Sequence, residues 1–150
     1  MKISSPGFAS EERIPTKHTC DNSDVNPTLN ISGVPDNAKS LALVVDDPDA
    51  PMGTWTHWLL WNIDPEISSI DENTVPTDAL QGKNDFGKLN WGGPCPADGE
   101  HHYSFKLFAL DTKLDLHEGS TIKDLENAIM GHILEQAELV GIYSREDGRE

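Results

Sequence analysis

The sequence is poor in positive charge. Its 150 residues contain 11 Lys and Arg against 26 Asp and Glu, which gives a formal net charge of −15 at pH 7. A surface this acidic repels phosphate backbones and anionic membranes, so the composition excludes nucleic acid as a partner. A small anionic ligand would have to be held by local hydrogen-bond donors against this unfavourable long-range field.

Long apolar runs are also missing. No stretch approaches the ~20 apolar residues that a helix needs to cross a bilayer, so we expect no integral membrane segment. Residues 1–6 lack the apolar core of a secretion signal, and we expect a cytoplasmic protein. A chain of this length suits a single domain, here residues 1–150, and the charged residues 145–150 are expected to fray.

Cysteine is scarce, with only Cys20 and Cys95 in the chain. Cytoplasmic proteins usually keep their thiols reduced, although a pair can form a disulfide where the fold brings it together, as in some thermophile proteins. The sequence leaves both states open. Two cysteines without a ligand spacing do not predict zinc, and the histidine spacings typical of metal sites are absent as well. We therefore predict no metal and no cofactor.

Short apolar runs predict a mainly β fold. Residues 41–45 are continuously apolar and rich in β-branched side chains, and they end at Asp46, as expected of a central buried strand. Leu29 and Ile31 alternate with polar residues, which indicates a strand with one buried face. The other expected strands cover residues 56–63, 103–111 and 139–143.

One helix is predicted, over about residues 121–134. Apolar residues recur at helical spacing from Ile122 to Ile133, and Ser120 or Thr121 precedes them as an N-cap. Because strands dominate and this helix comes late in the chain, we expect a β-sandwich with the helix at its side.

Histidines lie at the starts of two predicted strands. Alternate side chains of a strand share a face, so His101 and Tyr103 should lie together while His102 points away. By the same parity Trp55 and His57 should share a face. If both strands belong to one sheet, two imidazoles converge, with Trp55 and Tyr103 as walls.

The parity argument also places the neighbours of His57. Thr56 and Trp58 are expected on the opposite face of the strand from His57. The side chains available to a site at this strand are therefore those of Trp55 and His57.

Acidic residues follow the central strand. Asp47 and Asp49 lie in a loop stiffened by Pro48 and Pro51, where a cis proline would be compatible. Such acids either bond nearby backbone amides or orient an imidazole and raise its pKa, which favours a cation that can hold an anion. The Gly92–Gly93 pair is expected to add backbone N–H donors, as in an anion-binding nest.

Three function classes remain open. A binding module would hold a phosphate or carboxylate between the imidazoles and the glycine amides, with Asp47 receiving an ammonium group. A hydrolase would use the same residues with a metal or in acid–base chemistry, but a Gly-x-Ser-x-Gly nucleophile turn is missing. An interaction protein would dock its 81–99 loop onto a partner such as a protease.

The ordered set of segments resembles the phosphatidylethanolamine-binding protein family, also called the Raf kinase inhibitor-like family, and particularly its short prokaryotic branch. The resemblance implies a Greek-key β-sandwich of a large and a small sheet, with a pocket for phosphate or phosphoethanolamine-like head groups. It extends over nearly the whole chain and is carried by residues 19–21, 47–51, 55–58, 81–87, 92–96, 101–103 and 137–141.

The resemblance also implies a binding and regulatory role without catalysis, so no catalytic residue is assigned. Serine protease inhibition through surface loops is the implied alternative, and homodimers are typical of the prokaryotic branch. Where the family usually has Arg, this chain has His102, which we expect to alter packing or pair with an acid. By motif match the pocket residues are Asp47, Asp49, Ala50, Pro51, Trp55, His57, Gly93, Pro94, His101 and Tyr103.

Overall fold

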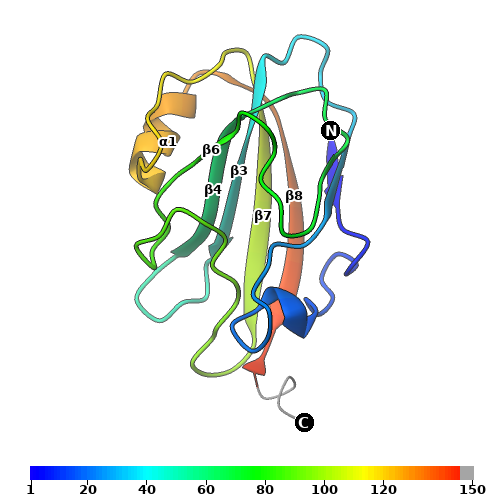
Figure 1. Ribbon diagram of the computed structural model, residues 1–150, viewed down its shortest axis with the longest axis vertical. Coiled ribbons are helices and arrows are strands. Elements are labelled where there is room, and N and C mark those ends of the chain that lie inside the picture. Colours follow the sequence, from blue (N-terminus) through cyan, green and yellow to red (C-terminus); the bar gives the residue numbers. More distant parts are fainter. Residues whose placement is uncertain (146–150) are drawn as a thin grey trace.

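The computed structural model describes residues 1–145 and contains two antiparallel sheets (Figure 1). The large sheet has the strand order β6-β4-β3-β7-β8, and the small sheet has the order β1-β2-β5. The expectation that the charged tail frays falls, beyond Arg145, outside the described residues. The strands are β1 (Lys2–Ser4), β2 (Leu29–Ser32), β3 (Ser40–Asp47), β4 (Trp55–Ile63), β5 (Ser69–Ile70), β6 (Leu80–Gln81), β7 (His101–Leu110) and β8 (Ile133–Tyr143).

The large sheet has Greek-key topology. β3, β4 and β6 follow one another across the sheet, and β7 then returns to pair with β3 on its other side. With the small sheet packed on one face, this arrangement confirms the expected mainly β sandwich of a large and a small sheet.

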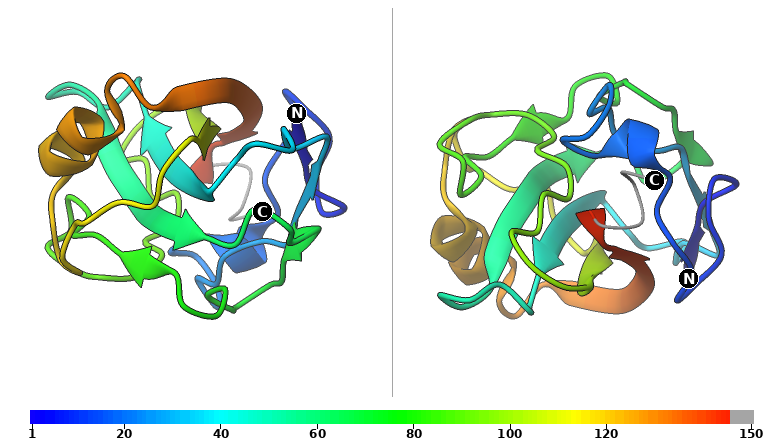
Figure 2. Two further views of the ribbon diagram at one scale, coloured as in Figure 1. Left: turned by 90° about the horizontal axis from the view of Figure 1, so that it is seen from above. Right: turned by 90° about the horizontal axis from the view of Figure 1, so that it is seen from below.

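The core lies between the two sheets. Side chains of Ile31 in β2, Leu43 in β3 and Phe105 in β7 belong to one buried apolar cluster. On the other face of the large sheet, Leu59 and Phe108 belong to a second cluster that includes residues of helix α1 (Ile122–Ile129). Figure 2 shows α1 and β1 on opposite sides of the large sheet. Both faces of the large sheet are therefore buried over much of their area.

β3 is the central strand that its apolar run predicts. All eight of its residues are buried, and it pairs with β4 on one side and β7 on the other. Leu41 faces the inter-sheet core and Ala42 faces the helix side, so the strand needs apolar residues on both faces.

The helix begins where it is predicted and ends earlier. Thr121 caps α1 in a reciprocal capping box with Asp124, but the helix stops at Ile129, so the predicted end near 134 is wrong. Gly131 turns the chain with φ 81°, and Ile133 pairs with Leu110 as the first residue of β8. The last strand consequently runs from 133 to 143 and is much longer than the predicted 139–143.

The structure also decides two points in the loops. Cys20 and Cys95 form a disulfide, with their Cα atoms 5.5 Å apart. The bond ties the loop after the 3₁₀ turn Thr16–His18 to the segment that precedes β7. Residues 1–145 contain no cis peptide bond, so Pro48 and Pro51 are both trans. None of the helices in the described part of the chain is long and apolar enough to span a membrane.

Reduction of the disulfide should lower the free energy of unfolding by about 4 kcal/mol, because the bond closes a loop between residues 75 positions apart. Urea unfolding with and without a thiol reductant measures the effect. The Cys20→Ser/Cys95→Ser variant should show the lower midpoint in both conditions. Equal midpoints for the native protein with its thiols oxidised and reduced would contradict the prediction.

Candidate ligand-binding site

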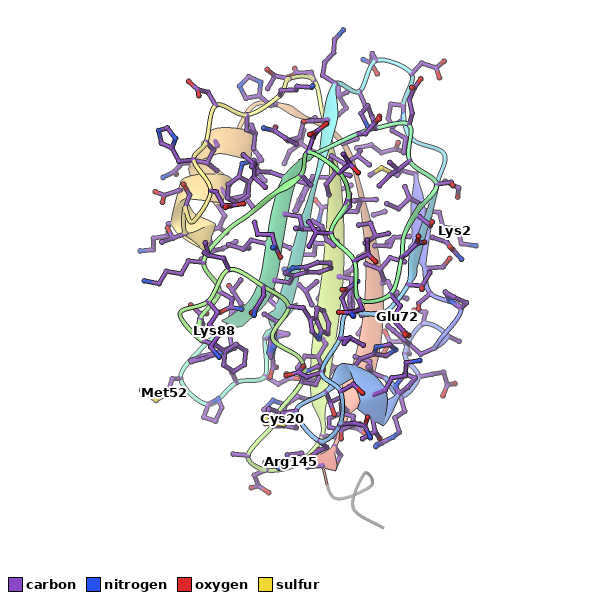
Figure 3. All side chains as sticks on the ribbon, in the orientation of Figure 1. Lys2, Cys20, Met52, Glu72, Lys88 and Arg145 are labelled. Carbon is purple, nitrogen blue, oxygen red and sulfur yellow. A yellow bond between two sulfur atoms is a disulfide. The ribbon has the colours of Figure 1, made fainter. Side chains whose placement is uncertain are left out.

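A cavity opens at the end of the large sheet where β3 ends and β4 and β7 begin. Asp47 pairs with Trp55 there, and Asp46 pairs with Ser104. The last residues of β3 therefore lie beside the first residues of β4 and β7. Figure 3 shows Cys20 and Met52 at this end of the molecule. The cavity has a volume of about 210 Å³ and is lined by Asp47, Ala50, Pro51, Trp55, His57, Phe86, Cys95, Pro96, Ala97, His101 and Tyr103.

Most of the residues assigned to a pocket from the sequence meet at this cavity, and three do not line it. These three are Asp49, which bonds to His102, Gly93, which lines a neighbouring hollow, and Pro94. Four lining residues were missed: Phe86, Cys95, Pro96 and Ala97. They come from loops without periodicity, and the only signal for Phe86 was its place in a segment that carries the family resemblance.

A β-bulge directs His57 into the cavity. Val45 pairs with Trp58, but the next residue of β3, Asp46, pairs with Thr56, so His57 is left as the extra residue of β4. The strand therefore places His57 beside Tyr103, with ring centroids 5.3 Å apart, while Trp58 also faces the inter-sheet core. The prediction that Trp58 lies on the opposite face from His57 is wrong because strict alternation fails at a bulge.

His101 is held by acceptors on both sides of its ring. Nδ1 lies 2.6 Å from Oδ2 of Asp47, and Nε2 lies 3.1 Å from the backbone carbonyl oxygen of Asp98. Both ring nitrogens therefore have polar partners within the protein. The expected pairing of a loop carboxylate with an imidazole is present, but both ring nitrogens of His101 are used within the protein.

Both carboxylate oxygens of Asp47 have a hydrogen-bond partner within the protein. Its Oδ1 accepts the backbone N–H of Asp49 at 2.8 Å, and its Oδ2 accepts from His101. Its carboxylate is buried at the cavity wall. Because each carboxylate oxygen can accept a second hydrogen bond, the expected role of Asp47 as receiver of a ligand's ammonium group stays a prediction.

His57 differs from His101 in its partners. Its Nδ1 donates to the carbonyl oxygen of Gly92 at 2.5 Å, which fixes the Nδ1–H tautomer. Its Nε2 has no hydrogen-bond partner among residues 1–145. Burial lowers the pKa of His57, and this effect outweighs the opposing influence of nearby carboxylates. The free protein therefore holds a neutral imidazole here.

The glycine amides are not free donors. The N–H of Gly92 donates to the carbonyl oxygen of His57 at 3.1 Å, and the N–H of Gly93 donates to Oδ1 of Asp24 at 2.9 Å. The expected anion nest at Gly92–Gly93 is thus contradicted, since both amides are satisfied within the protein.

Two other donors on the cavity wall are unsatisfied. The indole Nε1 of Trp55 and the hydroxyl of Tyr103 are buried without a hydrogen-bond partner among the described residues. Burial raises the pKa of Tyr103, so its hydroxyl stays protonated and can donate. A buried unpaired donor is unfavourable by roughly 1–3 kcal/mol.

His102 pairs with an acid, as expected. Its Nδ1 and its backbone N–H each lie 2.8 Å from Oδ2 of Asp49. Hydrogen bonds to the carboxylate raise the pKa of His102, and those from His102 lower the pKa of Asp49. Both side chains are about half exposed, so the pair contributes little to stability.

A second hollow differs from this cavity in the kinds of side chain that line it. A larger hollow of about 510 Å³ lies between residues 62–78 and Lys113, but its lining has no imidazole, indole or phenol. Within residues 1–145, no group of three or more His, Cys, Asp or Glu side chains is placed to hold a metal ion. The cavity at the start of β4 and β7 is therefore the candidate site.

The sequence matches the phosphatidylethanolamine-binding protein family over residues 4–144. A UPF0098 protein of Pyrococcus horikoshii is 49% identical to it, over 97% of this chain and 77% of that protein. A UPF0098 protein of Methanothermobacter thermautotrophicus is 45% identical, over 97% of this chain and 99% of the relative.

Solved structures show the same fold. The crystal structure of a phosphatidylethanolamine-binding protein homologue from Chlamydia trachomatis matches with a TM-score of 0.92 and 39% identity, over 95% of this chain and 96% of that one. YbcL of E. coli, described as a member of the mammalian family, matches with a TM-score of 0.89 and 33% identity, over 95% and 97% of the two chains.

Asp47→Asn should lower the free energy of unfolding by about 3 kcal/mol. The one remaining oxygen cannot replace both carboxylate oxygens, so an NH2 group would face either Nδ1 of His101 or the backbone N–H of Asp49. Asp49→Asn is the matched control, since its histidine pair is exposed, and it should cost less than about 1 kcal/mol. Urea unfolding at pH 7 measures both. Equal losses of stability in the two variants would show that the buried His101–Asp47 contact stabilises the protein no more than the exposed His102–Asp49 pair.

Proposed function

Because the chain belongs to the phosphatidylethanolamine-binding protein family, we propose that it is a non-enzymatic binding protein whose cavity holds a small anion. The proposed ligand carries a phosphate or a phosphoethanolamine-like head group. The ligand residues of the proposal are those pocket residues from the sequence that line the cavity: Asp47, Ala50, Pro51, Trp55, His57, His101 and Tyr103.

The unpaired donors of Trp55 and Tyr103 carry this proposal. Both are buried at the same cavity, and both are groups that only donate to an anion oxygen. Native proteins rarely leave such groups unsatisfied, and those that remain often mark a ligand or a bound water. One tetrahedral anion with several oxygens accepts from both at once.

The shape of the cavity supports a small ligand. Its volume of about 210 Å³ is below the range of about 300–1,000 Å³ that is typical of pockets for drug-sized ligands. Most of its wall is apolar, including Pro51, Phe86 and Pro96, and the few polar groups converge. Apolar walls around a few placed donors are typical of a small-ligand site, and they strengthen hydrogen bonds to a charged ligand.

Protonation of His57 completes the proposed site. The imidazole is neutral in the free protein, and its Nε2 remains for the ligand. A bound anion favours the imidazolium, so binding takes up a proton. The acidic surface thus faces a ligand that is held by neutral donors and by one cation formed on binding.

Serine protease inhibition is the second candidate function. Phe86 and Leu89 expose 42% and 41% of their surface on the 82–99 loop, which the disulfide and the side chain of Asn84 hold in place. A constrained loop with exposed apolar side chains suits docking into a protease cleft. Inhibition assays with chymotrypsin-like and subtilisin-like proteases test this candidate, and Phe86→Ala should weaken any inhibition.

Location and assembly remain part of the proposal. We propose that the protein is cytoplasmic. A structural disulfide such as Cys20–Cys95 persists in the cytoplasm mainly in hyperthermophiles, because the reductants of other cells keep cytosolic thiols reduced. Trapping the thiols by alkylation at cell lysis measures the state of Cys20 and Cys95. A homodimer is also proposed, and sedimentation equilibrium measures it.

Tyr103→Phe should weaken sulfate or phosphate binding about tenfold, because it removes a donor to the anion. It should leave the free protein as stable as before or more stable, since the hydroxyl has no partner there. Tyr143→Phe is the matched control: its hydroxyl donates to Asp21 at 2.6 Å and accepts from Thr19, so it should lose about 1–3 kcal/mol of stability and keep its anion affinity. Calorimetric titration and urea unfolding measure both. Unchanged affinity in Tyr103→Phe would remove the main support for the anion site.

Sulfate affinity should rise as the pH falls from about 8, by up to tenfold per pH unit for one proton taken up. Since burial lowers the pKa of His57 below its usual 6.5, the rise should continue below pH 6.5. Sulfate is the preferred probe because its own charge does not change in this range, unlike that of phosphate. His57→Gln should flatten the profile, whereas the exposed His102→Gln should keep it. A flat profile in the native protein would contradict the role of His57.

A further inference from the structure

The peptide group between Gly92 and Gly93 connects His57 to a carboxylate in another loop. Its carbonyl oxygen accepts from Nδ1 of His57 at 2.5 Å, and its N–H donates to Oδ1 of Asp24 at 2.9 Å. Both hydrogen bonds use one conjugated planar unit. Negative charge on Asp24 therefore polarises the N–H and makes the same peptide's carbonyl oxygen a stronger acceptor for the imidazole.

The local backbone is shaped to make this contact. A Cβ atom at Gly93 would lie 2.1 Å from the carbonyl oxygen of His18 and 2.3 Å from Oδ1 of Asp24, so a side chain there would push the carboxylate away. Asp24 itself has φ 56°, in the left-handed region that Asp and Asn tolerate better than most residues. The missing side chain of Gly93 and the left-handed backbone of Asp24 thus both accompany the hydrogen bond between these two residues.

Asp24 has no cation beside it. No Lys, Arg or His among residues 1–145 lies within ion-pair distance of its carboxylate, and Lys88 acts on it only from a longer distance. Burial is the main influence on Asp24 and raises its pKa, while the hydrogen bond from Gly93 opposes this. The N–H of Gly93 opposes burial most strongly, and the indole of Trp91 and the ring of His57 also lower the pKa of Asp24.

We propose that Asp24 is a positioning residue that acts on the ligand cavity through the Gly92–Gly93 peptide. It holds His57 as the Nδ1–H tautomer, leaves Nε2 for the ligand and stabilises the imidazolium that forms when an anion binds. The benefit to binding rests on the proposed function, but the link between Asp24 and His57 does not.

Three acids favour the imidazolium of His57, in the order Asp47, Asp24 and Asp46. Asp46 and Asp47 at the end of β3 also favour the imidazolium, but Asp46 is paired with Lys106 and Asp47 with His101. Asp24 is the acid whose hydrogen bond leads directly to the ring. The titratable groups facing His57 are Asp24 from its loop, Asp46 and Asp47 from β3, and Tyr103 and His101 from β7.

Asp24→Asn tests the proposal with little disturbance of the fold. Asn keeps a carbonyl oxygen for the N–H of Gly93 and tolerates the same φ, but it removes the charge. NMR titration of the His57 ring in the free protein should show its midpoint moved down by about 0.5–1 pH unit. The pH below which sulfate affinity stops rising should move down by the same amount.

Asp49→Asn is the control, because its carboxylate bonds to His102 and is absent from the influences on His57. It should leave the His57 midpoint in place. An unmoved midpoint in a folded Asp24→Asn variant, or an equal shift in both variants, overturns the proposal. If sulfate fails to bind the native protein, the proposed function fails, whereas the titration of the free protein still decides the link.

Discussion

The cavity depends on how the free edge of β4 is covered. β6 pairs with β4 only at residues 60 and 61, so the edge nearer the cavity has no strand beside it. The 82–92 loop takes that place, with the backbone N–H groups of Gly82, Asp85 and Gly92 donating to the carbonyl oxygens of residues 59, 56 and 57. Because buried backbone groups need partners, the loop must follow the strand closely. That path brings Phe86 to the cavity wall and the carbonyl oxygen of Gly92 to the ring of His57.

Much of the fold follows from apolar periodicity, and the failures have local causes. The run at 41–45 predicts a central strand because both of its faces are buried. The helix end is missed because Ile133 continues the helical spacing, whereas pairing with β7 takes it into a strand. Trp58 is misplaced because a bulge adds one residue to the strand, which no periodicity reveals. The cavity role of Phe86 and the bond between Cys20 and Cys95 depend on how distant loops meet, and a single sequence does not contain that information.

The proposed anion site lies in a protein of net charge −15, whose overall field opposes anion binding. The make-up of the cavity suggests how it could still hold an anion. A permanent cation in this cavity would be partly desolvated whenever the site is empty, and it would attract the many surrounding carboxylates. Neutral donors such as the indole of Trp55 and the hydroxyl of Tyr103 avoid both problems. Their unsatisfied state makes the free protein less stable, and the same free energy then favours the ligand. In the proposed site, selectivity would come from the apolar walls and the placed donors, because the overall charge of the protein opposes anion binding.

The two imidazoles illustrate how different partners give similar groups different roles. His101 lies between a carboxylate and a carbonyl oxygen, so both of its ring nitrogens have partners within the protein. It acts as part of the wall and stacks on Tyr103 at 6.5 Å between ring centroids. His57 has one carbonyl partner and one nitrogen left over, and burial keeps it neutral. If His57 contacted a carboxylate directly, one of its ring nitrogens would have a charged partner, as in His101. In the proposed arrangement, Asp24 acts through one peptide group, so it would orient the ring of His57 and still allow the ring to gain a proton when the ligand binds.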